Sequence, residues 1–552
     1  MPVIADAPGL LRAPRSRGVS AVTGWRVALF TIAVLATAPL AVIFASFLTP
    51  ADDVWRHFAS TILSGLIFNT VVLAVAVGAA SAMIGVGLAW LVAVCEFPGR
   101  RLFSWALILP LAIPAYVFAF VVVGLFDFTG PLQTWLRGIT GSNLTWLPEV
   151  RSRGGIIIVM TLALYPYVYL LARNAFRTQG KRMLEAGRIL GLSSLGAFIH
   201  VALPMARPWI AAGMSLVLME TLADFGAVSV FNYDTLTIGI YKAWYGMFSL
   251  TAASQIASIL VLVALVVLLL EQYTRSRMRF SGPGASGEAP RIVLAGWHRW
   301  VAVATCTAVL SAGFIIPVIQ LAVWAAQVAG EDLDARYLSY LWRTLFLAGL
   351  AATAICAVSL LLGYATRKHS DLASRLALRF STLGYAVPGA VLAVGIFICF
   401  AWMDARIPDW LRAMAGLSPG ALLQGSVMAM LCAYVIRFLA VGFGPIEGAL
   451  HRITHSVDEA SVLLGQAGWR LLARVHLPML RRGLAAGAIL VFIDVMKEMP
   501  ITLMTRPFGW DTLAVRIFEL TSEGQWERAA LPAVVLVIAG IVPLVQLTSA
   551  SE

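Results

Sequence analysis

Twelve apolar stretches, each about long enough to cross a lipid bilayer as a helix, constrain this chain more than any other feature. Only 12% of the 552 residues are charged, about half the share found in soluble proteins. Backbone groups in lipid must pair within their own segment, so each stretch is predicted to be helical. We therefore expect an all-α integral membrane protein with twelve transmembrane helices. The stretches are 26–48, 62–94, 103–126, 155–173, 208–231, 250–270, 300–329, 341–365, 376–402, 421–446, 483–504 and 529–548.

The basic residues predict the orientation of these helices. With the N-terminus placed inside, the inner segments hold 26 Lys and Arg and the outer segments 12, which favours cytoplasmic N- and C-termini. The net charge of +12 is thus a topology signal, and no nucleic-acid partner is expected. Residues 1–25 form a basic tail, and the stretch from Val27 to Leu48 is too long for the apolar core of a signal peptide. We expect it to be a retained first helix.

The five cysteines lie inside or at the edge of apolar stretches and form no CxxC or CxxH cluster. Neither a disulfide framework nor a stable metal site is expected, and no cofactor is expected on this chain. The cysteines are interpreted as small buried apolar residues.

A Gly-, Ser- and Pro-rich segment from Ser281 to Pro290 has the composition of a flexible linker and divides the chain in two. We place the linker at 276–298, the first half at 26–275 and the second half at 299–548. The halves repeat at a constant offset in residue number, which is the difference between the positions of Pro114 and Pro388. Insertions or deletions interrupt this match around the fourth stretch. Each half has six spans, an even number, so the repeats are parallel and enter the membrane in the same direction.

The same offset relates two cytoplasmic segments, 185–204 and 459–478. Both read Glu-Ala-x-x-x-x-Gly followed by Val-x-Leu-Pro at identical spacing, and both lie between the fourth and fifth spans of their half. The acidic residue suits a helix start, the glycine suits a left-handed helix end, and Leu-Pro is expected to break the chain before it re-enters the membrane. The residues predicted to act here are Glu185, Ala186, Gly191, Leu203, Pro204, Glu459, Ala460, Gly465, Leu477 and Pro478.

These paired segments resemble the EAA loops of ABC importer permeases, which form a short coupling helix that sits in a groove of an ATPase subunit. A loop of this kind in a single copy has an alternative interpretation as an ordinary amphipathic segment. Two copies at the same place in each half favour the coupling interpretation. The chain has no GxxxxGK[ST] sequence, so the ATPase is expected to be a separate chain that uses ATP and Mg.

Two acidic pairs lie inside the predicted membrane spans, Glu220 with Asp224 and Asp494 with Glu498, and Lys497 lies beside the second pair. Each pair is spaced i,i+4 and so shares one helix face. Ionisable groups at membrane depth usually face a bundle interior or an aqueous path. We predict that these five residues line a cation pathway. Two alternatives stay open: structural pairing with Lys497 or with Arg437, and exposure at the membrane interface.

Longer stretches resemble the fused permeases of ferric-iron ABC importers over residues 25–548. The stretches that carry the resemblance begin at Leu109, Tyr165, Met219, Thr235 and Lys497. The resemblance implies a type I importer fold in a bacterial inner membrane, an ATPase homodimer, and a periplasmic binding protein that delivers Fe(III). The chain departs from the family at Ala223, where the family usually has Asn. Tyr165, Tyr167 and Tyr169 are interpreted mainly as packing or interface anchors.

The outer segments 126–153, 232–249 and 505–528 are the expected docking surface for that binding protein. Fused thiamine permeases share the overall plan and are the nearest alternative. A secondary carrier without an ATPase and a non-transport scaffold or sensor are alternatives from other classes, but neither explains two matched cytoplasmic loops.

Overall fold

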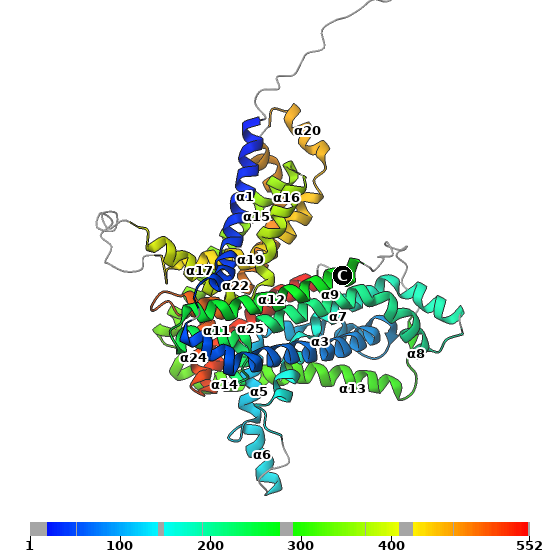
Figure 1. The fold of residues 1–552 in the computed structure, drawn as a ribbon. Helices are drawn as coiled ribbons and strands as arrows, with labels where there is room; N and C mark the ends of the chain where they lie inside the picture. Colours follow the sequence, from blue (N-terminus) through cyan, green and yellow to red (C-terminus); the bar gives the residue numbers. More distant parts are fainter. Residues whose placement is uncertain are drawn as a thin grey trace, which may run out of the picture.

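A computed structural model describes residues 19–50, 52–141, 148–189, 191–276, 291–369, 371–407, 423–466 and 469–549. The described part of the chain is almost entirely helical (Figure 1). The elements before residue 277 are α1 (Val19–Ala45), η1 (Ser46–Leu48), α2 (Asp53–His57), η2 (Phe58–Ile62), α3 (Leu63–Val94), β1 (Cys95–Glu96), α4 (Arg100–Ala106), η3 (Leu109–Ala112), α5 (Ala115–Phe126), α6 (Pro131–Thr140), α7 (Arg153–Ile189), α8 (Ser194–Ala197), η4 (Phe198–Ala202), α9 (Leu203–Ala223), α10 (Gly226–Val230), α11 (Leu236–Tyr241), η5 (Lys242–Gly246) and α12 (Leu250–Ser276).

The second half is likewise built mainly of helices. Its elements are β2 (Ile292–Val293), α13 (His298–Leu310), η6 (Ser311–Ile315), α14 (Ile316–Asp332), α15 (Ala335–Lys368), α16 (Leu372–Thr382), η7 (Leu383–Ala386), α17 (Gly389–Asp404), α19 (Val427–His451), α20 (His455–Leu463), α21 (Trp469–Leu471), η8 (Leu472–His476), α22 (Leu477–Lys497), α23 (Pro500–Thr505), α24 (Leu513–Ser522) and α25 (Trp526–Ser549).

The all-α membrane architecture is confirmed. Within the described residues, nine helices are long and apolar enough to cross a membrane, or ten if the bent pair α16–η7 and α17 counts as one span. Helix occupies every one of the twelve predicted stretches, and the exact number of spans remains a prediction. The expectation of one continuous helix per stretch is wrong for four of them. The stretches 103–126, 208–231, 376–402 and 483–504 are each interrupted.

The first span of each half packs against the other half. Helix α1 contacts α15, α16 and α17, and a Cβ on Gly395 of α17 would lie 2.7 Å from the carbonyl oxygen of Pro39. In return, η6 contacts η3 and α7, where a Cβ on Gly313 would lie 3.3 Å from Pro110. Pro39 and Gly313 are themselves related by the offset between the halves. The two halves are therefore interlocked by an exchange of their first helices, in the way that swapped elements join protomers.

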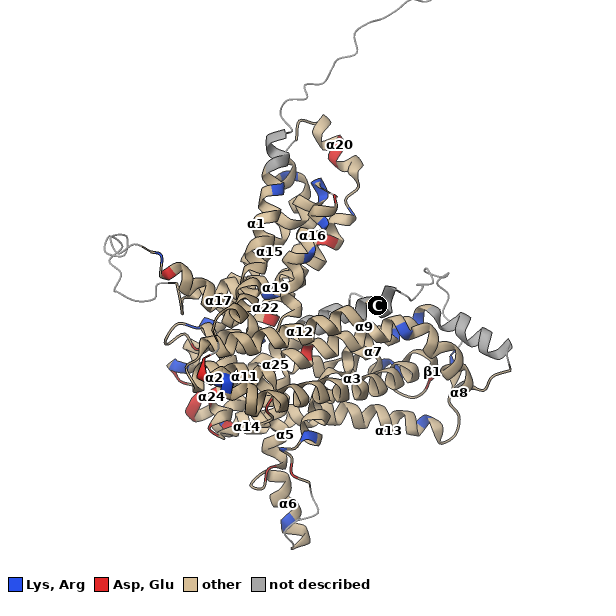
Figure 2. Cartoon of the chain, in the orientation of Figure 1, with Lys and Arg blue, Asp and Glu red and all other residues tan. Residues whose placement is uncertain are grey.

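The helices form two arms that diverge from a shared corner (Figure 1). The first arm contains α3, α7, α9 and α13 and ends near α8, and the second arm contains α1, α15, α16 and α19 and ends at α20. Helices α11 and α24 lie at the corner. The segments that hold the two Glu-Ala-x-x-x-x-Gly motifs are thus at the far ends of the arms. Charged residues are sparse along the arms, but a few acidic segments lie in the interior between α22 and α25 (Figure 2).

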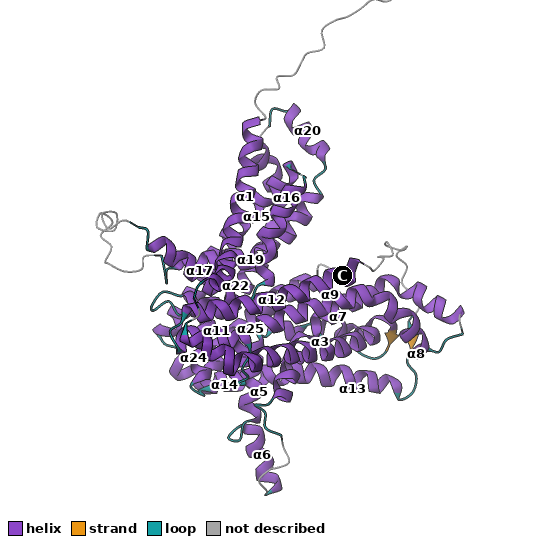
Figure 3. Cartoon of the chain, in the orientation of Figure 1, coloured by secondary structure: helices purple, strands orange, loops and turns teal. Residues whose placement is uncertain are grey.

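The only strands in the described residues are two short ones near the end of the first arm (Figure 3). Strand β1 pairs in parallel with β2, with Cys95 opposite Ile292. Arg291 adds an ion pair to Glu96 at 3.4 Å. The segment 276–298 was predicted to be a linker. Residues 277–290 lie outside the described residues, and the rest of the segment attaches the start of the second half to the first half.

Candidate functional site

The four interrupted stretches bound one site. The breaks fall at Pro114 before α5, at Asp224 after α9, at Pro388 before α17 and at Glu498 after α22. These breaks form two pairs, each related by the offset between the halves. Irregular backbone at membrane depth is tolerated where it is buried in protein or lines a cavity. The repeated breaks therefore indicate a cavity between the two halves.

A cavity of about 210 Å³ lies at these breaks, and its wall has a two-fold pattern. Every second-half residue that lines it has a first-half partner, at the same offset, that lines it too. The cavity therefore lies on the pseudo-two-fold axis that relates the halves. The same offset also relates the cavity residues of α7 to those of α19, although insertions or deletions interrupt the sequence match around the fourth stretch. The pairs are Leu111/Tyr385, Ala163/Arg437, Leu164/Phe438, Glu220/Asp494, Ala223/Lys497, Asp224/Glu498, Phe225/Met499 and Gly226/Pro500.

The structure brings together all five residues predicted to line a pathway. The second carboxylate of each pair also has a local task at its helix break. Asp224 Oδ1 accepts a hydrogen bond from the backbone nitrogen of Val228 at 3.1 Å, and Glu498 Oε1 accepts one from Ile501 at 3.1 Å. Each carboxylate satisfies an amide that the helix start leaves unpaired.

The two acidic pairs differ in their cationic neighbours. Arg437 Nε lies 3.3 Å from Glu498 Oε2, and both side chains are at least nine-tenths buried. Arg437 Nη1 also donates to the carbonyl oxygen of Val387 at 2.8 Å, so Arg437 joins α19 to two of the breaks. Structural pairing, one of the open alternatives, is therefore observed for Glu498. At the position of Arg437 the first half has Ala163.

Several polar contacts cross between the halves at the cavity. Tyr385 donates to Glu220 Oε1 at 3.2 Å, and Lys497 Nζ donates to the carbonyl oxygen of Leu111 at 3.4 Å. Tyr116 donates to the carbonyl oxygen of Lys497 at 3.5 Å. These contacts tie the helix breaks of one half to those of the other, so movement of either half changes the cavity.

The three tyrosines of the fourth span divide between packing and the cavity. Tyr165 and Tyr169 are fully buried and donate to the carbonyl oxygens of Leu107 at 2.9 Å and Ser104 at 3.0 Å. They are packing residues, as predicted. Tyr167 lines the cavity instead.

The cavity has oxygen ligands but no preformed metal centre. Within the part of the chain that the structure describes, no group of three or more His, Cys, Asp or Glu is placed to hold a metal ion. The cavity offers partly exposed carboxylates at Glu220, Asp224 and Asp494, and phenolic oxygens at Tyr167 and Tyr385. Such hard oxygen groups suit the transient passage of a hard cation.

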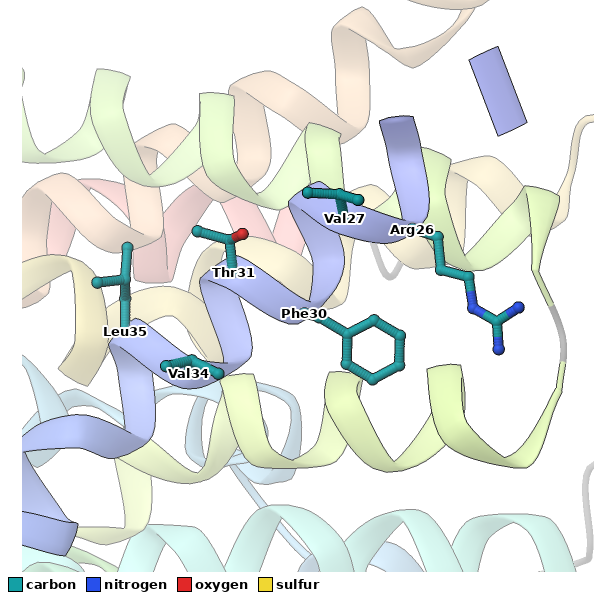
Figure 4. A pocket seen from close by; sticks show the side chains of 6 residues that line it. All are labelled: Arg26, Val27, Phe30, Thr31, Val34 and Leu35. Carbon is teal, nitrogen blue, oxygen red and sulfur yellow. The ribbon is translucent and has the colours of Figure 1, made fainter. Parts of the chain in front are cut away.

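A larger hollow of about 510 Å³ lies elsewhere, along the outer face of α1 (Figure 4). Arg26 at its end is paired with Asp371 at 3.0 Å, and most of the remaining wall is apolar, including Phe30 and Val34. This surface has no chemistry for moving a cation.

The second-half motif forms a separate short helix at the end of its arm. Helix α20 contains Glu459 and Ala460, both of which are exposed, and it ends before Gly465, whose φ of 76° is left-handed as predicted. Val462, Leu463 and Leu464 are exposed beside them, with 88% of the Leu463 side chain accessible. An exposed apolar patch of this kind is typical of a surface that contacts a partner.

An ionic joint holds α20 to its arm. Arg367 of α15 forms an ion pair with Asp458 at 3.0 Å and donates to the carbonyl oxygens of Leu450 at 3.0 Å and Ile453 at 2.9 Å. His476 Nε2 lies 2.8 Å from the other oxygen of Asp458. Although burial opposes it, the hydrogen bond with His476 and the Arg367 ion pair lower the pKa of Asp458.

The first-half motif is organised differently. Glu185 and Ala186 belong to α7, which runs on to Ile189, so the expected separate short helix does not form before Gly191. The side chains of Glu185 and Ala186 lie outside the described residues. Gly191 has a φ of 66°, which again confirms the predicted left-handed position.

The Leu-Pro pairs do not break the chain, contrary to the expectation. Leu203 and Pro204 begin α9, and the π turn η4 joins α9 to α8 without an interruption; Leu477 and Pro478 follow η8 in the same way. Proline has no N–H, and the wider π turn before it accommodates the missing hydrogen bond. The helices that carry the motifs end earlier, before Gly191 and Gly465.

Sequence reasoning missed three features of these sites. It overlooked the joint of Arg367, Asp458 and His476, the exposed apolar patch on α20, and the cavity role of Tyr385. The joint brings together residues from three separate elements, α15, α20 and η8, which no local pattern connects. Tyr385 had a usable signal, because it lies just before Pro388, at the mapped break.

Comparison with known proteins places two matches on this chain. The sequence profile of the family described as "Binding-protein-dependent transport system inner membrane component" matches residues 83–280 and again residues 355–550. Each match falls in one half, includes one Glu-Ala-x-x-x-x-Gly motif and supplies one acidic pair of the cavity.

Several individual proteins are similar to the chain. The "Fe(3+)-transport system permease protein FbpB 2" of Haemophilus influenzae is 25% identical over 491 residues, 87% of this chain and 89% of that protein. The "Ferric transport system permease protein FbpB" of Actinobacillus pleuropneumoniae is 23% identical over 416 residues, 70% of this chain and 57% of that protein. The "Sulfate transport system permease protein CysT" of Escherichia coli is 28% identical over 200 residues, covering 35% of this chain and 69% of that protein.

Proposed function

The chain belongs to the binding-protein-dependent transport system inner membrane components, and from this membership we propose that it is a fused two-half permease of an ABC importer for Fe(III). Both permease halves are present in one multi-pass inner membrane chain. The observation that supports transport of a cation is the cavity on the pseudo-two-fold axis, with an acidic pair from each half. The choice of Fe(III) is supported by relatives named as ferric permeases that cover up to 87% of the chain.

We infer that Glu220, Asp224, Asp494, Lys497 and Glu498 form the transport pathway. Their side chains meet where four helices are interrupted, so the backbone there can shift without unwinding a continuous helix. Partly exposed carboxylates give a cation a temporary replacement for its hydration shell. The lack of a three-ligand metal centre among the described residues suits release, because a tightly held ion would not move on.

The ends of the arms are the proposed contacts for a homodimeric ATPase. On the second arm these are Glu459, Ala460, Gly465, Leu477 and Pro478, with the exposed apolar patch of α20 beside them. On the first arm they are the matching Glu185, Ala186, Gly191, Leu203 and Pro204. The arms diverge toward these ends (Figure 1), which suits a state open to the cytoplasm. Closure of the ATPase dimer on ATP and Mg would draw the ends together and open the opposite side.

The corner of the arms is the proposed docking region for a periplasmic binding protein. It lies opposite the ATPase contacts and carries parts of the segments 126–153, 232–249 and 505–528. Both termini are proposed to be cytoplasmic, which places the motifs and the basic segments on the same side of the membrane.

Uptake by a reconstituted complex tests this function. The permease is purified with its ATPase, placed in liposomes and supplied with radiolabelled Fe(III) on its binding protein. We expect uptake that depends on ATP and on the binding protein. Uptake of thiamine in place of iron would favour the nearest alternative cargo, and uptake by the permease without any ATPase would support a secondary carrier.

A further inference from the structure

Eight pairs of residues in the cavity wall are related by the offset between the halves, but the two members of a pair do not always match in charge. Among the eight related pairs of lining residues, three exchange an apolar first-half residue for a polar or cationic second-half residue: Leu111/Tyr385, Ala163/Arg437 and Ala223/Lys497. The acidic positions, in contrast, are acidic in both halves. Both cations of the cavity therefore come from the second half.

These two cations stand next to the second-half carboxylates. Arg437 forms an ion pair with Glu498 at 3.3 Å, and Lys497 is one turn from Asp494 on α22, close enough to interact electrostatically. Arg437 also acts on Glu220 through space, but within the described residues its ion pair is with Glu498. Its second bond, to the carbonyl oxygen of Val387, holds it on the second-half side.

The first-half carboxylates have different neighbours. Glu220 accepts a hydrogen bond from the neutral phenol of Tyr385, and Asp224 accepts one from a backbone amide. Both side chains are partly exposed in the cavity, as Asp494 is, whereas Glu498 is only 7% exposed. A buried carboxylate that already has a counter-ion gains little from a second cation. The counter-ion already offsets the free-energy cost of removing the carboxylate from water.

We propose that the cargo cation is bound by the first half, at Glu220 and Asp224, and that Arg437 and Lys497 are built-in counter-ions that occupy the equivalent second-half pair. The two cations thereby set the specificity of the cavity, because they leave one acidic pair for one cation. This proposal rests on the proposed transport function and adds to it the side of the pathway that the cation uses.

Matched variants of the full complex test the asymmetry by uptake of radiolabelled Fe(III). E220Q is expected to lower uptake by at least about tenfold, the loss typical of one charge-assisted contact. A223K places in the first half the lysine that the second half already has, and it is expected to cause a similar loss, whereas A223M of similar length is expected to lower uptake less. The double variant D494N/K497A removes an acid and its counter-ion together and is expected to lower uptake at least about threefold less than E220Q does.

A second measurement does not depend on transport. Terbium(III) is a hard trivalent probe whose luminescence is sensitised by nearby tyrosines, and Tyr167 and Tyr385 both line the cavity. In the detergent-solubilised complex, E220Q is expected to lose more of a tyrosine-sensitised signal than D494N/K497A does. Binding-protein-stimulated ATP hydrolysis by each variant verifies that the complex is folded and assembled.

The outcomes separate this proposal from the function on which it rests. If wild type takes up no Fe(III) but the terbium signal depends on Glu220, the iron assignment fails and the asymmetry stands. If D494N/K497A loses uptake and signal as severely as E220Q, or if E220Q loses neither, the asymmetry is overturned.

Discussion

The cytoplasmic ends of the two arms carry the same motif at the same spacing, but different side-chain interactions stabilise them. At the second end, the fourth span of the half stops at His451 and α20 follows as a separate helix, held by Arg367, Asp458 and His476. At the first end, α7 continues into the motif and ends at Ile189. An aromatic cluster of Trp90, Phe176 and Phe198 lies beneath it, with ring centroids 4.9 to 6.4 Å apart.

One position differs between the two ends. Where α19 ends, Arg367 donates to the carbonyl oxygens of Leu450 and Ile453, and the Leu450 carbonyl also accepts from the backbone nitrogen of Ile453. The first half has Ala93 at the position of Arg367, and alanine cannot donate to a carbonyl. There, α7 runs on to Ile189 and pairs its carbonyl groups within the helix. A repeated motif therefore does not guarantee a repeated local structure.

Reversing the charge of both motif acids is expected to have the largest effect. The variant E185R/E459R should lower ATP-driven uptake by more than about 100-fold. The two substitutions reverse the charge at both proposed ATPase contacts, and mismatched charges at an interface cost several kcal/mol. Membrane insertion should be unchanged, since both residues lie outside the spans. Uptake assays with the single variants then rank the two ends against each other. Wild-type uptake by E185R/E459R would contradict the coupling role, and E459Q serves as a mild control.

Removing the aromatic cluster tests the first end. W90A is expected to destabilise the packing of the first arm end by about 3–5 kcal/mol, the usual cost of truncating a large aromatic side chain in a core. Hydrogen–deuterium exchange should show faster exchange around 191–202 and unchanged exchange around 455–463. Equal loosening at both ends would mean that the ends are not separate structural units.

Removing the central arginine tests the second end. R367A is expected to loosen α20 by on the order of 3 kcal/mol, as for a buried ion pair that loses one partner. Faster hydrogen exchange at 450–463 measures it. The exposed Arg452 on the same loop offers a matched control, and R452A should leave exchange there unchanged. An equal effect of both substitutions would show that net charge, not the joint, stabilises α20.

Acid pH is expected to produce the smallest change, and at the second end alone. The pKa of Asp458 is lowered in the folded chain. Its contribution to folding stability is therefore complete above the ordinary pKa of an aspartate, and it is lost as the pH falls through the lowered pKa. The difference in melting temperature between wild type and D458N should therefore be constant near neutral pH and shrink below about pH 4. A difference that persists unchanged at pH 3 would contradict this assignment.

Much of the candidate site could be predicted from the sequence. The acidic pairs and the mapped prolines were found from one offset, and Lys497 from its place beside the second pair. All of these residues except Pro388 line the cavity. The division of labour among them could not be predicted. Whether Arg437 pairs with Asp494 or Glu498 depends on how α19 faces α22, because Arg437 and Glu498 come from different spans.

The sequence by itself determined the membrane class, the two parallel halves and the positions of the motifs, because hydropathy, charge distribution and repetition are properties of the chain alone. Tertiary structure decided where the helices break, which first helix packs on which half, and which carboxylates have a cation beside them. These features depend on backbone groups and charges finding partners across space. In the low-dielectric interior an unpaired group is costly, so the partners available across space decide which local arrangement is stable.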